Sequence, residues 1–302
     1  MQRIKLEVFN SLFGKDLTGN EIDFLLVLSF YQDQRGCVRG VYYKQMMEEA
    51  QMSVQAFYDC KKSLEEKGVI TSVRVHNDYD IWIIGNDFTG FTQDDYAEGR
   101  VKYLSTSAAL FRDRNFKALK PKQKLLAMDI LNIQNAGAPN GVQAYRIRRE
   151  NFIRKYANTV APDGSIRKGI LDITVRTLQK YLKMLKLYFS IGLKEGIYYF
   201  TLRKAFGKRA VTGITEKETA MEQILTAACR RNRVKDPDPK ERAEILKVLT
   251  YREKDILKYS INISTVIERM IEVINAHIIN PRKWSRRLKT SLFVKLLKEE
   301  TA

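Results

Sequence analysis

The sequence predicts an α+β fold, mostly α, in which one order of elements occurs twice and is followed by an all-helical C-terminal region. Three observations lead to this prediction. Two helical segments, at residues 53–67 and 172–186, share one spacing of apolar residues. Each is followed by two β-rich runs around a turn, which is the pattern of a β-hairpin. From residue 215 onward, apolar residues recur at helical spacing alone.

The first copy is expected to contain a helix, a short strand that runs into a short helix, a third helix and a hairpin. Thr18 and Glu21 have the spacing of a capping box at the start of the first helix. Ser53 is suited to cap the third helix, in which Phe57 and Leu64 lie on one face. In order, the segments are LTGNEIDFLLVLSFYQ (17–32), CVRGVYYKQMMEEAQ (37–51), SVQAFYDCKKSLEEK (53–67) and GVITSVRVHNDYDIWIIG (68–85).

The second copy repeats this order, with its third helix displaced by 121 residues from that of the first. Thr174 then stands at the position of Ser53, and Leu185 at that of Leu64. Thr174 is suited to cap this helix, and Asp172 competes for the same role. Pro121 falls in the first turn of the opening helix, where the backbone N–H has no intrahelical partner to lose. The segments are KPKQKLLAMDILNIQ (120–134), AYRIRRENFIRKYA (144–157), DITVRTLQKYLKMLK (172–186) and KLYFSIGLKEGIYYFTLR (186–203).

Helix, strand, helix, turn, helix and hairpin are the elements of a winged helix-turn-helix domain. We therefore expect two tandem winged helix-turn-helix domains followed by an all-helical C-terminal region. The alternative is a pair of α+β domains of another kind. Turn residues without a helical period at 86–100 and 204–215 predict linkers at the two boundaries.

Charge is distributed unevenly over these parts. Lys and Arg number 10 against 16 Asp and Glu in residues 1–98, 24 against 6 in 99–213, and 19 against 13 in 214–302. The net charges are therefore −6, +18 and +6, and a segregated positive charge favours binding to a polyanion. We expect 1–98 to be an acidic winged-helix domain for dimerisation or partner contact, 99–213 a strongly basic winged-helix domain for DNA binding, and 214–302 a helical C-terminal domain.

The third helix of the second copy is the expected reading helix. A helical wheel turns its apolar side chains inward and its basic side chains outward. A major groove admits one α-helix, and Arg, Gln, Thr and Lys supply donors for base edges and partners for phosphates. We expect Arg176 or Gln179 to read bases and the lysines to lie near phosphates. The predicted DNA-binding residues are Thr174, Arg176, Thr177, Gln179, Lys180, Lys183 and Lys186 in this helix, Lys194 at the hairpin turn, and Arg167 and Lys168 in an insertion at 158–172 that is expected to order only on DNA.

The third helix of the first copy carries acids at the matching surface. Its wheel exposes Gln55, Asp59, Lys62 and Glu66. Carboxylates are repelled by a phosphate lattice, so this face is expected to meet protein rather than DNA. A homodimer through the N-terminal domain is the partner that we expect there.

Several function classes find no support in the sequence. The longest apolar run is too short for a membrane span, the N-terminal segment lacks a secretory signal, and we expect a cytoplasmic protein without a membrane partner. Cys37, Cys60 and Cys229 lie far apart, which argues against a disulfide framework or a zinc site. No phosphate-binding loop or nucleophile elbow is present, so we expect a non-catalytic protein without a metal or cofactor.

The last expected helix begins at NPRKW, with Asn280 as its cap and Pro281 in its first turn. Its basic residues are candidates for additional DNA contacts beside the second domain. These residues are Arg282, Lys283, Arg286 and Arg287.

At the level of element order and charge, residues 15–205 resemble the tandem winged-helix replication initiators of plasmids and mobile elements. The tail IINPRKWSRRLKTSLFVKLLKEE is similar to the last helix of DnaD-like primosome proteins, although Trp284 stands where those proteins more often have Tyr. The resemblance implies a replication initiator that binds double-stranded origin repeats and contacts the replication machinery. A winged-helix transcriptional regulator is the alternative, and a protein-interaction scaffold or RNA binder is the third.

Overall fold

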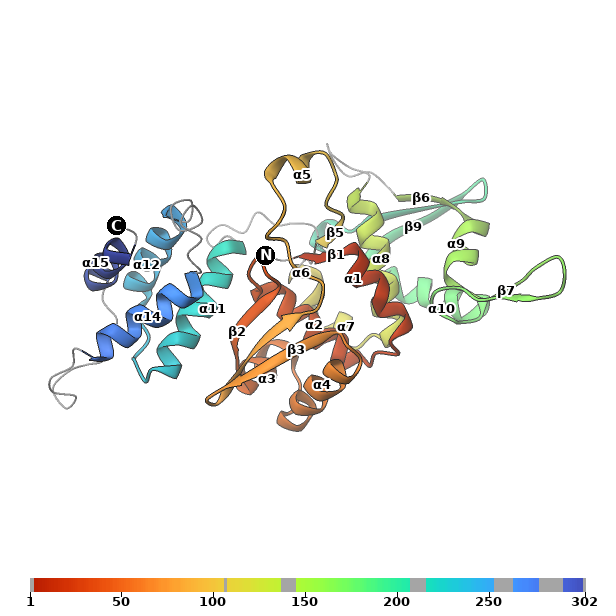
Figure 1. The fold of residues 1–302 in the computed structure, drawn as a ribbon. Helices are drawn as coiled ribbons and strands as arrows, with labels where there is room; N and C mark the ends of the chain where they lie inside the picture. Colours follow the sequence, from red (N-terminus) through yellow and green to blue (C-terminus); the bar gives the residue numbers. More distant parts are fainter. Residues whose placement is uncertain are drawn as a thin grey trace.

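The computed structural model describes residues 3–105, 108–136, 145–206, 216–252, 263–276 and 290–300. The fold is α+β, with small antiparallel sheets among many helices. Figure 1 shows three parts in a row: C-terminal helices at one end, a first three-stranded sheet with its helices in the middle, and a second at the far end. We call the two sheet-containing parts the first unit and the second unit.

The first unit has the predicted order of elements. Its sheet runs in the order β2-β4-β3, so the short strand pairs with the last strand of the hairpin. Thr18 and Glu21 form the predicted capping box, and the Ser53 hydroxyl accepts a hydrogen bond from the N–H of Ala56. The elements are α2 (Gly19–Tyr31), β2 (Cys37–Val41), α3 (Tyr43–Ala50), α4 (Val54–Glu66), β3 (Ile70–Val75) and β4 (Asp78–Ile83).

The second unit repeats the first. Its sheet order, β6-β10-β9, again pairs the short strand with the last hairpin strand. Gln51 and Asp172, the residues two positions before each third-helix cap, both have left-handed backbone conformations, with φ of 56° and 46°. The Thr174 hydroxyl caps the third helix as predicted. The elements are α8 (Pro121–Ala136), β6 (Tyr145–Arg148), α9 (Arg149–Tyr156), α10 (Val175–Leu185), β9 (Phe189–Lys194) and β10 (Ile197–Leu202).

The insertion between α9 and α10 differs from the expected loop. It forms a small hairpin of β7 (Thr159–Val160) and β8 (Ile166–Arg167), which projects from the second unit in Figure 1. The Asn158 side chain fixes its base by accepting from the N–H of Gly169 and donating to Asp172. These contacts tie the base of the hairpin to Asp172, two residues before the Thr174 cap of α10.

The stretch expected to be the first linker is also ordered. It contains α5 (Gln93–Ala97), which begins with a capping box of Thr92 and Asp95. Beyond it, β5 (Tyr103–Ser105) pairs with β1 (Arg3–Lys5) at the N-terminus. The remaining short elements of this region are α1 (Leu6–Ser11), η1 (Leu12–Gly14), α6 (Ala108–Phe111), α7 (Arg114–Lys117) and, after the second hairpin, η2 (Lys204–Phe206).

The two units share one hydrophobic core. A single cluster of buried side chains extends from Ile4 to Phe200, and the opening helices α2 and α8 pack against each other within it. Lys124 of α8 forms a buried ion pair with Asp23 of α2, with 2.7 Å between Lys124 Nζ and each carboxylate oxygen. The two units are therefore packed together rather than joined only by the chain between them.

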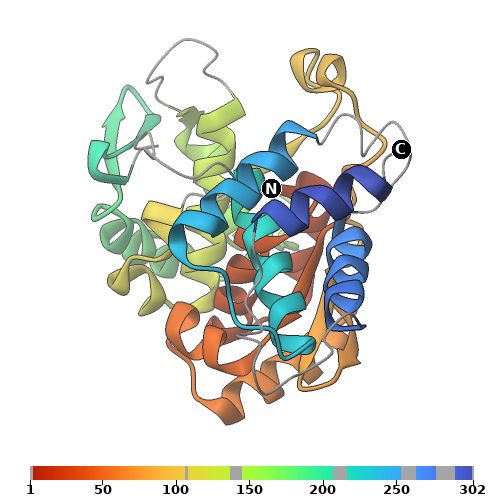
Figure 2. The ribbon, with the colours of Figure 1, turned by 90° about the vertical axis from the view of Figure 1, so that its left-hand side faces the viewer.

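The C-terminal helices form a second core and lie against the first unit. They are α11 (Glu216–Arg231), α12 (Pro239–Tyr251), α14 (Ile263–Ala276) and α15 (Thr290–Glu300). Asp238 caps α12, and Pro239 lies in its first turn. Helix α11 packs along β2, and Figure 2 shows the C-terminal helices in front of the first unit.

Candidate nucleic-acid interface

Helix α10 presents the side chains that the wheel places outward. Leu178, Leu182 and Leu185 are buried under the helix and Tyr181 is half-buried, so the apolar face is accounted for. The opposite face is exposed apart from Thr177, which is half-buried and whose hydroxyl contacts that of Thr174. The exposed residues on it are Thr174, Arg176, Gln179, Lys180 and Lys183, with Lys186 at the C-terminal cap.

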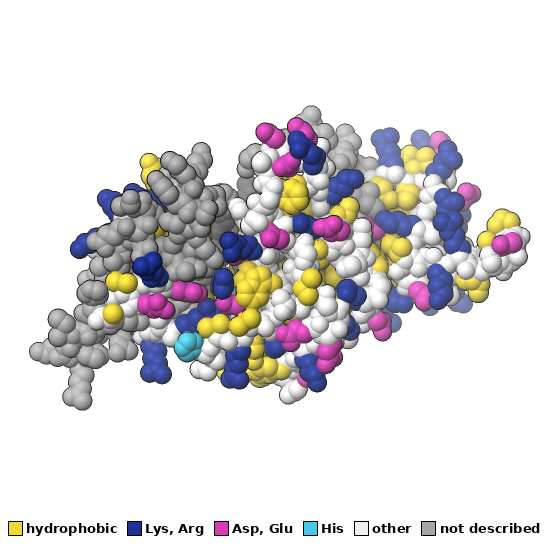
Figure 3. All heavy atoms as spheres, in the orientation of Figure 1, with side chains coloured by type: hydrophobic (Ala, Val, Ile, Leu, Met, Phe, Trp, Pro, Cys, Tyr) yellow, Lys and Arg dark blue, Asp and Glu magenta, His cyan; other side chains and the backbone are white. Residues whose placement is uncertain are grey.

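The charge on this face is unneutralised. Arg176, Lys180, Lys183 and Lys186 have no ion-pair partner among the residues that the structure describes. A cluster of unpaired cations on one helix face repels itself and attracts a polyanion. In Figure 3, Lys and Arg side chains gather over the end of the molecule that holds α9 and the β9–β10 hairpin, with few acidic side chains between them.

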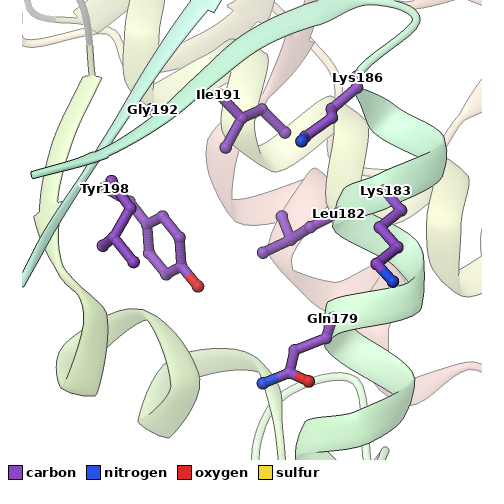
Figure 4. A pocket seen from close by; sticks show the side chains of 8 residues that line it. Gln179, Leu182, Lys183, Lys186, Ile191, Gly192 and Tyr198 are labelled. Carbon is purple, nitrogen blue, oxygen red and sulfur yellow. The ribbon is translucent and has the colours of Figure 1, made fainter.

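A hollow of about 200 Å³ lies between α10 and the β9–β10 hairpin. Its floor is apolar, with Leu182 from the helix and Ile191 from the hairpin, while Gln179, Lys183 and Lys186 stand along one wall (Figure 4). Gly192 and Tyr198 form the opposite wall. The arrangement combines an apolar surface with cations, which suits a backbone sugar and its phosphate.

The hairpin turn brings further cations to this end of the unit. Lys194 is exposed at the turn and lies 3.8 Å from Glu195, a loose surface pair of little energetic weight. The N–H of Arg149, the first residue of α9, donates to the carbonyl of Gly196 at 2.8 Å. The start of α9 therefore lies against the turn, and Arg149 and Lys194 are both exposed there.

Four exposed arginines in this region escaped the sequence reasoning. Arg146 and Arg148 alternate on β6 with Tyr145 and Ile147, which turn toward the core. Arg146 also lies over the ring of Tyr199 on the neighbouring strand, 5.7 Å from its centroid. The alternation of Tyr-Arg-Ile-Arg is the signal that could have identified Arg146 and Arg148, because side chains of a strand point to opposite faces in turn. The four are Arg146, Arg148, Arg149 and Arg154.

The remaining predicted residues divide into two groups. Arg167 and Lys168 are exposed at the base of the β7–β8 hairpin, next to the start of α10. The basic cluster of the last helix, Arg282, Lys283, Arg286 and Arg287, lies outside the described residues, as do Asn280 and Pro281.

Helix α4 of the first unit differs from α10 in its charge. Lys62 lies 3.8 Å from Glu66, and Asp59 accepts a hydrogen bond from Gln55 at 2.8 Å. Exposed acids and cations are therefore interspersed on this helix. The four side chains that the wheel places outward, Gln55, Asp59, Lys62 and Glu66, are exposed as predicted.

Part of the acidity of the first unit faces the C-terminal helices of the same chain. The buried Asp78 accepts hydrogen bonds from Arg230 and Arg231 of α11, and Arg231 also pairs with Asp80. Burial by itself raises the pKa of Asp80, but the hydrogen bonds from Arg231 and from the Gly40 N–H, and the charge of Arg231, hold that pKa below its usual value. One partner of the acidic unit is thus intramolecular.

The described residues contain no group of three or more His, Cys, Asp or Glu side chains arranged to hold a metal ion. Among the helices that the structure describes, none has the length and apolar content required to cross a bilayer. No family model, curated protein or solved structure matches the chain.

Proposed function

We propose that both units are winged helix-turn-helix domains and that the chain is a non-catalytic, sequence-specific binder of double-stranded DNA. The observation that carries this proposal is the exposed cationic face of α10, whose lysines and arginine lack ion-pair partners among the described residues. The repeated element order and the identical strand order of the two sheets support the domain assignment.

In the proposed complex α10 lies in the major groove. Its N-terminal half carries Arg176, whose guanidinium matches the two acceptors of guanine, and Gln179, whose amide matches adenine. Lys183 and Lys186 lie further along the helix, beside the hollow next to the hairpin. We assign the first pair to base readout and the second pair to the phosphate backbone.

The hairpin and β6 extend the proposed contact along the backbone. Lys194 at the turn and Arg149 at the start of α9 lie close together, because the Arg149 N–H bonds to Gly196. The exposed side chains of Arg146 and Arg148 continue the positive surface along β6. Contacts of this kind fix the register of the protein on the duplex without reading its sequence.

The biological role that we propose is replication initiation at origin repeats. The support is the resemblance in element order and charge to tandem winged-helix initiators. Because α2 and α8 pack in one core, a dimer formed through the first units would hold its two α10 helices in fixed relation, which suits repeats of fixed spacing. Contact with the replication machinery and self-association through the first unit are parts of the same proposal. A transcriptional regulator would use the same readout, and the location of the bound sites distinguishes the two roles.

Neutralising α10 tests the DNA-binding proposal. The full chain is titrated into a mixed-sequence labelled duplex over a series of salt concentrations, with fluorescence anisotropy as the readout. Each phosphate contact contributes about 0.9 to the slope of log affinity against log salt, so Lys183→Gln with Lys186→Gln lowers the slope by about 2. Lys62→Gln on α4 is the matched control and leaves the slope unchanged. Equal slopes for all three proteins would refute the placement of DNA on α10.

A further inference from the structure

The β7–β8 hairpin, residues 158–169, is a further feature of the second unit alone. In the first unit three residues, Gln51 to Ser53, join α3 to α4, whereas a whole hairpin stands between α9 and α10. The insertion therefore accompanies the cationic reading helix and is absent beside α4. We call residues 158–169 the finger.

The finger exposes an apolar pair. Val160 and Ile166 are cross-strand neighbours, and they are 75% and 71% exposed, more than the other described aliphatic side chains. Pro162 is exposed between them in the chain. Two large aliphatic side chains held side by side in water are unfavourable, since each loses the free energy that burial would provide. Burial of the pair against a partner would therefore be favourable.

The base of the finger is rigid. Asn158 bonds to Gly169 and Asp172, and the Ile170 N–H donates to the carbonyl of Lys155 at 2.8 Å. Gly169 is packed so tightly that a Cβ there would lie 2.4 Å from backbone atoms of Tyr156 and Ala157. These contacts tie the base of the finger to α9 and to the start of α10, and Figure 1 shows β7 projecting beyond both helices.

Charge identifies the kind of partner. Arg167 and Lys168 are exposed at the base, and the only acid of the finger, Asp163, closes the turn by accepting from the N–H and hydroxyl of Ser165. The finger is therefore net positive and continues the cationic surface of α10. A partner with anionic borders and an apolar interior between them fits this pattern, and a DNA groove is such a surface.

We propose that the finger crosses the phosphate backbone beside α10 and places Val160 and Ile166 against base steps of the adjacent minor groove. This inference rests on the proposed function. Arg167 and Lys168 then contact the phosphates that are crossed. The minor groove is about 6 Å wide and does not admit a two-stranded ribbon unless it opens. Apolar side chains that enter it in this way unstack base steps and bend the duplex. The finger is thus a DNA-bending element, separate from the reading helix.

The test is bending of a duplex labelled at its two ends with donor and acceptor dyes. A duplex of about 40 bp is short compared with the persistence length of about 150 bp, so an increase in energy transfer on binding reports a bend. We expect the full chain to raise energy transfer and the double variant Val160→Ser with Ile166→Ser to abolish the rise. Its affinity falls by less than about tenfold, because the phosphate contacts remain.

Val73→Ser is the matched control, because Val73 is 54% exposed on β3 of the first unit and lies outside the finger. The control variant bends the duplex as the unaltered protein does. Bending by the double variant equal to that of the unaltered protein would overturn the inference, and so would binding of the unaltered protein without any bend. Failure of the unaltered protein to bind duplex at all would instead refute the proposed function.

Discussion

The ion pair between Asp23 and Lys124 gives the most quantitative prediction for the joined units. Lys124 is 1% and Asp23 7% exposed by side chain, and Lys124 Nζ also donates to the carbonyl of Gly19 at 3.2 Å. Burial raises the pKa of Asp23 and lowers that of Lys124, so desolvation opposes both charges. Lys124→Met removes the ammonium and leaves the carboxylate buried without that partner.

The expected cost of Lys124→Met is about 3–5 kcal/mol, the range found when one partner of a buried pair is removed. The double variant Asp23→Leu with Lys124→Met removes both charges, and we expect its stability to equal or exceed that of the unaltered protein by about 1–4 kcal/mol. Stability is measured by guanidinium unfolding followed by circular dichroism. Lys120→Met, at the exposed position just before the same helix, is the control, with a change within about 0.5 kcal/mol.

A change below about 1 kcal/mol for Lys124→Met would contradict the buried pair, because no uncompensated carboxylate would then have been left in the core. A double variant less stable than Lys124→Met alone would refute the reasoning as well. Either result would mean that α2 and α8 are not packed as described, and that the two units are free to move apart.

Three further predictions follow from other contacts. Arg176→Ala weakens binding to a selected duplex by about 1–3 kcal/mol with little effect on binding to random duplex, whereas Lys183→Ala weakens binding to both alike. Anisotropy titrations measure the difference. If Arg176→Ala lost the same affinity for both duplexes, Arg176 would have no role in base readout. Gly40→Val releases α11 from β2, because a Cβ at Gly40 would lie 2.2 Å from Cβ of Ala227 and because the φ of Gly40 is +62°. Limited proteolysis between residues 206 and 216 then becomes faster. An unchanged rate of cleavage would contradict the packing of α11 on β2. Because the pKa of Asp80 is lowered in the folded chain, its ion pairs stabilise the protein above pH of about 4, and this stabilisation is lost as the pH falls further. In Asp80→Asn the melting temperature therefore falls less steeply on the acid side of its pH profile. An unaltered acid side would contradict the coupling between Asp80 ionisation and folding.

Local patterns predicted the elements well. The capping box of Thr18 and Glu21, the Ser53 and Thr174 caps and the apolar spacing of α10 are all confirmed. Each depends on residues within one or two helical turns, where spacing alone decides which groups meet. The same holds for the exposed face of α10. Because the leucines are buried on one side of the helix, its basic side chains lie on the opposite, exposed side.

Contacts between distant segments were not predictable in this way. Pairing of β1 with β5 and the Asp23–Lys124 pair join residues about a hundred positions apart, and no periodicity links them. The two-residue strands of the finger are too short to show an alternation. The linker expected at 86–100 follows from the same limit, because the burial of Phe88 and the hydrogen bond from its N–H to the Gln34 carbonyl depend on neighbours from elsewhere in the chain. The capping box of Thr92 and Asp95, by contrast, is local, and its spacing is visible in the sequence.

Selection of bound sequences from a library of random duplexes tests the central claim most directly. The full chain is used at about 150 mM salt, where the Debye length is about 8 Å and weak phosphate contacts are screened. If α10 reads bases, one motif is enriched, and the enrichment at its contacted position is lost with Arg176→Ala. Binding that is weak and shows no enriched motif would contradict sequence-specific readout, and α10 would then be a basic surface without a code.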